Sequence, residues 1–176
     1  NNPDSDPIIC RIRQIGFANE KGDKVNVIYV PCYLNGADGI FNTAYYDLLI
    51  GMDATVFPSY YEPWGYTPLE SVAFGVPTVT TTLSGFGQWV LATDENTFDA
   101  CGVNVIARGD FNYDEVAARI ANSLKYLISA DQQQTTLIRS RAINLASLAA
   151  WSYFIEYYVD AFRIALDSAR MRATEG

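Results

Sequence analysis

Hydrophobic and polar positions change between two periodicities along the chain, and this change predicts an α/β fold. Short runs rich in β-branched residues at 25–30, 54–57, 77–82 and 103–107 have the length and composition of strands. The segments between and after them carry apolar residues at helical spacing. Strands separated by helices form a parallel sheet flanked by helices, a Rossmann-like arrangement. Ligands of such sheets bind at the carboxyl ends of the strands.

Helices are predicted wherever apolar residues recur three and four positions apart. Residues 8–15 and 43–50 each form such a segment, and a glycine closes each one. From about residue 113 the chain is helical, over 113–128, 132–150 and 151–169. The last of these helices is rich in aromatic residues, so we expect it to present an apolar face.

Composition narrows the class of protein. The chain has 176 residues, of which 49 % are hydrophobic and 18 % charged, so we expect one globular domain over residues 1–176. Its formal net charge of −8 does not attract a nucleic acid. The negative charge does not exclude the binding of a single nucleotide, because a few backbone amides can hold its phosphate. The absence of histidine from the sequence excludes an imidazole base and zinc–histidine sites.

Cysteine usage and hydropathy bear on the compartment. Cys10, Cys32 and Cys101 lie far apart and form neither a CxxC pair nor a disulfide framework. We interpret them as small buried residues in a reducing cytosol. No apolar run approaches the length that spans a bilayer. These features predict a cytoplasmic protein that does not engage a membrane.

Candidate chemistry follows the run 54–57. Thr67 has the residue type of a helix N-cap, Pro68 suits the first helical position, and Glu70 completes a capping box. The predicted helix runs to about Phe74. Its start faces the ligand edge of the sheet, so the amides of 65–69 and the helix dipole form a phosphate site.

Two acidic residues frame this helix start. Glu62 lies in the turn, where a carboxylate can face a ligand. Glu70 follows eight positions later and is interpreted either as a ligand-binding residue or as a cap alone. Ser84 and Gly85, in the turn after the run 77–82, either line the opposite wall of the same cleft or make a tight connection.

Two of these motifs are long and specific. They are Val-Phe-Pro-Ser-Tyr-Tyr-Glu-Pro-Trp-Gly-Tyr-Thr-Pro at 56–68 and Leu-Ser-Gly-Phe-Gly at 83–87. Both resemble the signature of animal and fungal glycogen synthases, and weaker likeness extends over roughly residues 6–166. The resemblance implies a retaining glycosyltransferase of the GT-B type, with its active site between two Rossmann-like domains. Such enzymes transfer glucose from a nucleotide sugar to the non-reducing end of an α-1,4-glucan.

The resemblance also implies roles for individual residues. Glu62 would contact the transferred glucose near its reacting centre. Glu70 would hold the ribose, and Tyr45 would stack on the base. The amides around Gly65 would hold the diphosphate, with no metal ion or other cofactor required. The donor-binding residues implied in this way are Tyr45, Trp64, Gly65, Tyr66, Thr67 and Glu70.

Departures from the family pattern lead to further expectations. The chain corresponds to a C-terminal nucleotide-sugar-binding domain that is truncated at its start, without the acceptor domain. We therefore expect the chain alone to be inactive, its partner to be an N-terminal domain of the same protein, and its exposed sheet edge to favour homo-oligomers. Of an arginine-rich helix that senses glucose 6-phosphate, only Arg139 and Arg141 remain, on what we interpret as a solvated helix face. We predict little or no activation by this effector.

The identity of the donor and the catalytic status stay open at this stage. The residues of the 56–68 motif, by their resemblance to the family, favour UDP-glucose as the donor. A transferase of the same architecture that uses ADP-glucose is an alternative, and so is a non-catalytic module that binds a nucleotide sugar or a glucan.

Overall fold

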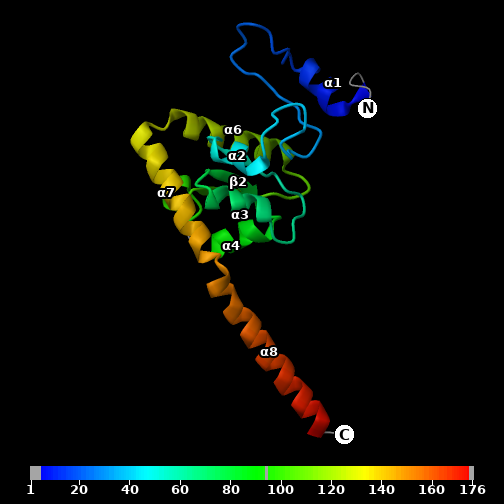
Figure 1. Cartoon of the computed structure of the whole chain (residues 1–176), viewed down its shortest axis with the longest axis vertical. Helices are drawn as coiled ribbons and strands as arrows, with labels where there is room; N and C mark the ends of the chain where they lie inside the picture. The colour runs from blue at the N-terminus through cyan, green and yellow to red at the C-terminus, as the bar shows by residue number, and fades with distance from the viewer. Residues whose placement is uncertain (1–4, 94, 175–176) are drawn as a thin grey trace. The chain divides into compact units, whose positions relative to one another are not determined.

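The computed structural model describes residues 5–93 and 95–174, and it divides the chain into two compact units. One unit comprises residues 1–47 and the other residues 48–176. The sheet lies in the second unit (Figure 1). Within the described residues, no helix is both long enough and apolar enough to cross a membrane.

The first unit begins with helix α1, Pro7–Gln14. The carboxylate of Asp6 caps its start by accepting hydrogen bonds from the amides of Ile8 and Ile9 at 2.9 and 3.2 Å. Gly16 follows its end with a φ of +84°, the left-handed conformation that glycine adopts most readily. The helix predicted over 8–15 is therefore confirmed. The helix predicted over 43–50 is confirmed as α2, Tyr45–Ile50, with a start two residues later.

The strand predicted over 25–30 is wrong. Val25 is 52 % exposed and Ile28 61 % exposed, and the run has no regular secondary structure. A strand forms only beside a neighbour that completes its hydrogen bonds, and the described residues supply none for this run. The side-chain amide of Asn19 takes that place at Val27, accepting from its N–H at 2.8 Å and donating to its C=O at 2.7 Å. The predicted burial of Cys32 is also wrong, because Cys32 follows this open run and is exposed.

The described part of the second unit contains a parallel sheet of three strands in the order β1-β2-β3. The strands are β1 (Thr55–Val56), β2 (Thr78–Thr81) and β3 (Val103–Ile106). Thr78 in β2 pairs with Thr55 on one side and with Val103 on the other. All three strands were predicted, each over a slightly longer run. Because the strands are parallel, their carboxyl ends meet at one edge of the sheet.

Among the residues that the structure describes, five helices surround the sheet and a sixth follows them. They are α3 (Tyr66–Ala73), α4 (Gly85–Thr93), α5 (Phe98–Cys101), α6 (Tyr113–Ser129), α7 (Gln132–Leu148) and α8 (Trp151–Thr174). The helices predicted over 113–128, 132–150 and 151–169 are confirmed as α6, α7 and α8. Helices α4 and α5 were not predicted, because glycines and polar residues at their starts resemble turns.

Two apolar clusters fix the helices against the sheet. One joins α3, α4, α5 and α7 to β3, around Val72, Phe86 and Val103. The other joins α5, α6 and α7 to β2 and β3, around Val79 and Ile106. Because α7 contributes to both clusters, it locks the two groups of helices together.

Three hydroxyl groups set the position of α3 on the sheet. Thr55 Oγ1 lies 2.6 Å from Ser71 Oγ and 2.9 Å from Thr78 Oγ1, and Thr78 donates to Ser71 at 3.0 Å. Ser71 and Thr78 are fully buried. Buried polar groups are costly unless they are paired, so this cluster favours one placement of α3 against β1 and β2.

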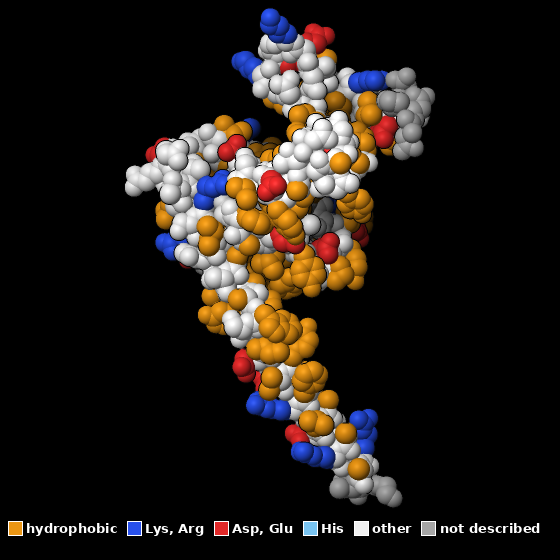
Figure 2. Space-filling view, in the orientation of Figure 1, with side chains coloured by type: hydrophobic (Ala, Val, Ile, Leu, Met, Phe, Trp, Pro, Cys, Tyr) orange, Lys and Arg blue, Asp and Glu red, His pale blue; other side chains and the backbone are white. Residues whose placement is uncertain are grey.

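Helix α8 carries exposed aromatic side chains, as predicted from its composition (Figure 2). The exposed residues are Trp151, Tyr153, Tyr157, Tyr158 and Phe162. A hollow of about 520 Å³ lies where the first turns of α8 meet α3 and α4. Phe154 lies on its wall and makes edge-to-face contacts with Trp64 and Trp89. The expected apolar face on the last helix is therefore confirmed.

Candidate active site at the carboxyl edge of the sheet

The turn after β1 is held against the turn after β2 by backbone hydrogen bonds. The amide of Glu62 donates to the carbonyl of Leu83 at 3.1 Å, and the amide of Gly85 donates to the carbonyl of Glu62 at 3.0 Å. The hydroxyl of Thr81 donates to the carbonyl of Ser59 at 2.7 Å. Glu62 is thus fixed on both sides at the edge of the sheet, outside any helix, as the sequence predicted.

The close approach of the two turns requires glycine in the second one. A Cβ on Gly85 would lie 2.2 Å from the carbonyl oxygen of Pro63 and 3.0 Å from Cα of Trp64. A Cβ on Gly87 would lie 2.2 Å from the carbonyl oxygen of Thr81. A Cβ does not come this close to a non-bonded oxygen in real structures, so backbone contact restricts both positions to glycine. Gly85 therefore determines how near the Glu62 turn lies to the rest of the edge.

Helix α3 begins differently from the prediction. Its N-cap is Gly65 with a φ of +111°, and no side chain of the described residues caps the first amides. The prediction of Thr67 as N-cap is wrong, because the left-handed turn at Gly65 lets the chain enter the helix two residues earlier. Pro68 therefore occupies the third helical position, where the missing N–H costs nothing. Glu70 lies beyond the capping-box position, so its interpretation as a cap is also wrong.

The earlier start also narrows the amides that face a ligand. The first three helical positions have no acceptor within the helix, and here they are Tyr66, Thr67 and Pro68. Proline has no N–H. The amide of Leu69 donates to the carbonyl of Gly65 at 3.4 Å. The amide of the N-cap Gly65 also has no acceptor in the helix, so an anion at this helix start is offered the amides of Gly65, Tyr66 and Thr67 together with the helix dipole.

The side chain of Glu62 lies beside this helix start. Its Cγ is 3.5 Å from the point where a Cβ on Gly65 would lie, and the residue is half-buried. Glu70 is also half-buried, on the following turn of α3. A carboxylate next to an anion-binding helix start can stabilise positive charge that develops near a departing phosphate. The contacts predicted for Glu62 and Glu70 with sugar and ribose remain predictions.

The remaining predicted residues differ in how their side chains are used. The ring of Trp64 packs against Phe86, Trp89 and Phe154, with centroid distances of 6.4, 6.0 and 5.6 Å. A contact between Trp64 and a donor would therefore run through its backbone. Tyr45 lies at the start of α2 in the other unit, where its ring contacts that of Tyr46 at 5.3 Å. Its predicted role at the base remains a prediction.

The hydroxyl of Ser84 serves the fold of the second turn. It donates to the carbonyl of Thr81 at 3.1 Å, accepts from the amide of Gly87 at 3.0 Å and lies 3.1 Å from the hydroxyl of Thr80. The side chain is buried. Ser84 is therefore bonded within its own turn, and only backbone atoms of Ser84 and Gly85 are left to line a cleft.

Arg108 is a basic residue at this edge that the sequence analysis missed. It lies two residues after the end of β3, and its guanidinium carbon lies 3.9 Å from the centroid of the Tyr60 ring. One of its Nη atoms donates to the carbonyl of Pro58. The available signal was its position, since it comes just after the predicted strand 103–107 and so at the carboxyl edge. No group of His, Cys, Asp and Glu suited to a metal ion exists among residues 5–93 and 95–174.

Arg139 is half-buried, and its side chain is hydrogen-bonded to the end of α2. Its guanidinium donates to the carbonyls of Ile50 and Met52 at 3.3 and 3.2 Å, at and just beyond the end of α2. The side chain is partly exposed, and it also satisfies carbonyls that a helix end leaves open. Arg141 is exposed. The predicted weak response to glucose 6-phosphate remains a prediction, and the engagement of Arg139 supports it.

Comparison with known proteins places the chain in a family. The glycogen synthase family model matches residues 1–173. The chain is 36 % identical over 167 residues to liver glycogen (starch) synthase of Mus musculus, an alignment that covers 94 % of this chain and 23 % of the mouse protein. It is 34 % identical over 168 residues to glycogen (starch) synthase isoform 1 of Saccharomyces cerevisiae, with 94 % and 23 % covered.

A third relative shows the same extent of matching. Glycogen (starch) synthase of Neurospora crassa is 33 % identical over 168 residues, covering 96 % of this chain and 24 % of that protein. The chain thus spans about a quarter of the length of the curated relatives that it matches. With a family model matching nearly its whole length, the chain belongs to the glycogen synthase family.

Proposed function

We propose that this chain forms the nucleotide-sugar side of the active site of a retaining glucosyltransferase of the glycogen synthase type. The enzyme transfers glucose from UDP-glucose to the non-reducing end of an α-1,4-glucan. The observation that carries the proposal is the placement of Glu62, which is fixed by Leu83 and Gly85 beside the start of α3. Membership of the family supports the reaction class.

The mechanism divides charge between two features of this edge. The amides of Gly65, Tyr66 and Thr67 and the dipole of α3 hold the diphosphate, which leaves with negative charge. The carboxylate of Glu62 lies on the sugar side and stabilises the positive charge of the oxocarbenium-like transition state. The acceptor hydroxyl attacks from the face that the diphosphate leaves, and the departing phosphate takes its proton. The configuration at the anomeric carbon is thereby retained without a covalent intermediate.

Glu70 and Tyr45 complete the donor site in this proposal. Glu70 holds the ribose from the second turn of α3, and Tyr45 stacks on the uracil. No metal ion or other cofactor takes part, because the helix start meets the charge of the leaving group. The enzyme works in the cytoplasm, in keeping with Cys10, Cys32 and Cys101, which are thiols and not disulfides in the described structure.

The test is glucose incorporation into glycogen by the full-length product of the gene that encodes this chain. UDP-glucose and ADP-glucose are supplied in parallel, to wild type and to Glu62→Gln and Glu62→Ala. We expect incorporation from UDP-glucose, and a loss of about 100-fold in kcat in both variants. Thermal stability should stay unchanged, because the fixed hydrogen bonds of Glu62 come from its backbone.

A matched control separates this effect from a general loss of charge. Glu115→Gln removes an exposed carboxylate that pairs with Arg119 at 2.8 Å on α6, and it should leave kcat unchanged. Incorporation from ADP-glucose alone would overturn the choice of donor. A folded wild-type protein that incorporates glucose from neither donor would overturn the enzyme proposal and favour a binding module.

A further inference from the structure

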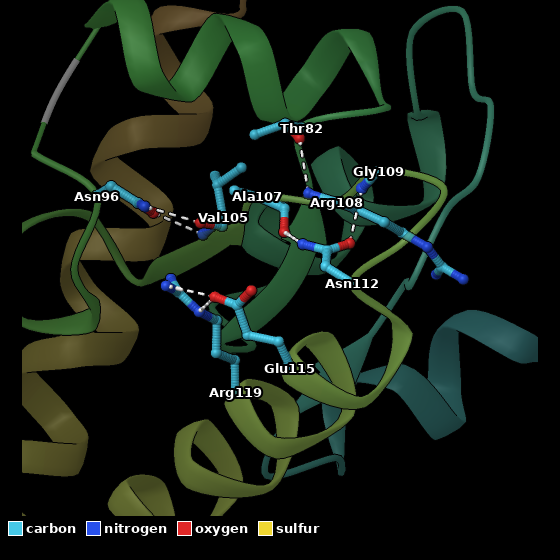
Figure 3. A network of polar contacts seen from close by, with 9 residues as sticks. All are labelled: Thr82, Asn96, Val105, Ala107, Arg108, Gly109, Asn112, Glu115 and Arg119. Atoms are coloured by element: carbon cyan, nitrogen blue, oxygen red, sulfur yellow. Dashed lines mark hydrogen bonds and ion pairs between the residues drawn. The ribbon is translucent and has the colours of Figure 1, made fainter.

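The loop after β3 is built to hold one side chain in a fixed place. The amide of Arg108 donates to the hydroxyl of Thr82 at 3.0 Å, which ties the ends of β3 and β2 together. The side chain of Asn112 closes the loop, donating to the carbonyl of Ala107 at 3.0 Å and accepting from the amide of Gly109 at 2.8 Å. Figure 3 shows these bonds around the backbone of Arg108, with its side chain extending away from them.

That side chain reaches the turn after β1, fifty residues earlier in the sequence. The guanidinium donates to the carbonyl of Pro58 and lies over the face of the Tyr60 ring, 3.9 Å from its centroid. A hydrogen bond fixes the backbone at one end of the segment, and a cation–π contact fixes the side chain two residues later. Arg108 therefore restrains the turn that leads into Glu62 at two points.

This turn needs such a restraint on its outer side. Tyr60 is 54 % exposed and Tyr61 is 81 % exposed, so little apolar packing holds the residues that precede Glu62. The bonds from Thr81 and to Leu83 act on Ser59 and Glu62, from the side of β2. Arg108 acts from the β3 side on Pro58 and Tyr60, two of the three positions that those bonds leave.

We propose that Arg108 is a positioning residue for Glu62, acting through Pro58 and Tyr60, and that it does not bind the phosphates of the donor. One of its Nη atoms already donates to a carbonyl and its plane lies over a ring, so a phosphate would have to compete with both contacts for the guanidinium. Small displacements of a catalytic group cost large factors in rate. The kinetic part of this inference rests on the proposed function.

The kinetic test uses the full-length protein with Arg108→Met, Arg108→Lys and the matched control Arg119→Met. Arg119 is exposed on α6 and contacts Glu115, so its replacement removes a cation of the same kind from outside the turn. We expect Arg108→Met to lower kcat about tenfold or more while the Kd for UDP stays within about twofold of wild type. Arg108→Lys should recover most of the loss, because an ammonium still lies over a ring and donates to a carbonyl.

A double substitution tests the route through Tyr60. Tyr60→Leu removes the ring, and the combination with Arg108→Met should cost less than the product of the two single effects, because both remove one contact. Effects that multiply fully would overturn the route through the ring. A Kd for UDP that rises about tenfold with kcat unchanged would assign Arg108 to the phosphates and overturn the proposal.

Hydrogen exchange tests the positioning without any catalytic assay. The amides of residues 59–62 should exchange faster in Arg108→Met than in wild type, while Arg119→Met leaves them unchanged. This result is expected even if the wild-type protein transfers no glucose, so it separates a failure of this inference from a failure of the proposed function. Unchanged exchange in Arg108→Met would overturn the positioning role.

Discussion

Two turns lie side by side at the carboxyl edge of the sheet, and they are built in opposite ways. The turn after β1 exposes its tyrosine side chains, with Tyr60 at 54 % and Tyr61 at 81 %. The turn after β2 buries Ser84, which is 1 % exposed, and it leads into α4 with Phe86 at 0 %. We call the second turn the support, because its buried hydroxyl groups form hydrogen bonds within the turn itself. The first turn, which the second one holds in place, has its side chains free to face a ligand.

The largest effect on stability and activity is expected from adding one methyl group to the support. Gly85→Ala places a Cβ 2.2 Å from the carbonyl oxygen of Pro63, so the two turns must separate. We expect a loss of about 2–3 kcal/mol in stability, seen as a lower thermal midpoint, and loss of most transfer activity. Gly109→Ala is the control, because no atom of the described residues lies within 4 Å of its Cβ position. A Gly85→Ala variant as stable and active as wild type would contradict the close contact.

A smaller effect is expected from removing the hydroxyl that organises the support. Ser84→Ala leaves the amide of Gly87 and the hydroxyl of Thr80 without this partner in the interior. The expected loss is about 1–2 kcal/mol in the free energy of unfolding, measured by denaturant titration. The control Ser147→Ala removes an exposed hydroxyl that bonds to the carbonyl of Asn144, and it should change stability by a few tenths at most. Equal effects at the two serines would remove the distinction between support and surface.

A hydrogen bond away from both turns makes the stability of the protein depend on pH. The hydroxyl of Tyr126 donates to a carboxylate oxygen of Asp99, and this bond raises the pKa of Tyr126 above its usual value. A raised pKa in the folded state stabilises the protein at pH values below the unfolded pKa, and this contribution is lost as pH rises through the folded pKa. Tyr126→Phe should therefore cost up to about 1 kcal/mol at neutral pH and less in strong alkali, in unfolding measured at both pH values. A pH-independent difference would contradict the assignment.

The smallest effect on stability is expected in the exposed turn itself. Tyr61→Ala removes a side chain that is 81 % exposed, so the free energy of unfolding should change by less than about 0.5 kcal/mol. Thermal melting of this variant beside Ser84→Ala compares the two turns directly. A large loss at Tyr61 would show that the first turn also supports the fold.

The sequence was sufficient to predict the elements whose pattern is set by their own burial. The strands around Val79 and Val103 are short β-branched runs that helices bury, and α6 and α7 carry a repeated apolar stripe. It failed at the run 25–30, which has the residues of a strand and no neighbour among the described residues. Propensity describes what a segment can form, and pairing decides whether it forms.

The candidate site was predicted unevenly for a related reason. Glu62 and the helix start after it were found, because they belong to one continuous motif. The true N-cap at Gly65, the helical state of 85–93 and the contact of Arg108 with Tyr60 were missed. Each of these depends on atoms brought together by tertiary structure, such as the carbonyl of Pro63 against Gly85. Short-range patterns carry no record of such contacts.

The amide of Asn19 has a consequence for how this protein behaves at high concentration. The run Val-Asn-Val-Ile-Tyr-Val at 25–30 has the composition of segments that stack into cross-β fibrils. Asn19 forms hydrogen bonds with the backbone N–H and C=O of Val27, so these groups in the middle of the run cannot pair with a strand of another copy. Asn19 holds a φ of +56°, which asparagine tolerates better than most residues. Its replacement would leave the N–H and C=O of Val27 open to a strand of another copy, so we expect the tendency to aggregate to rise.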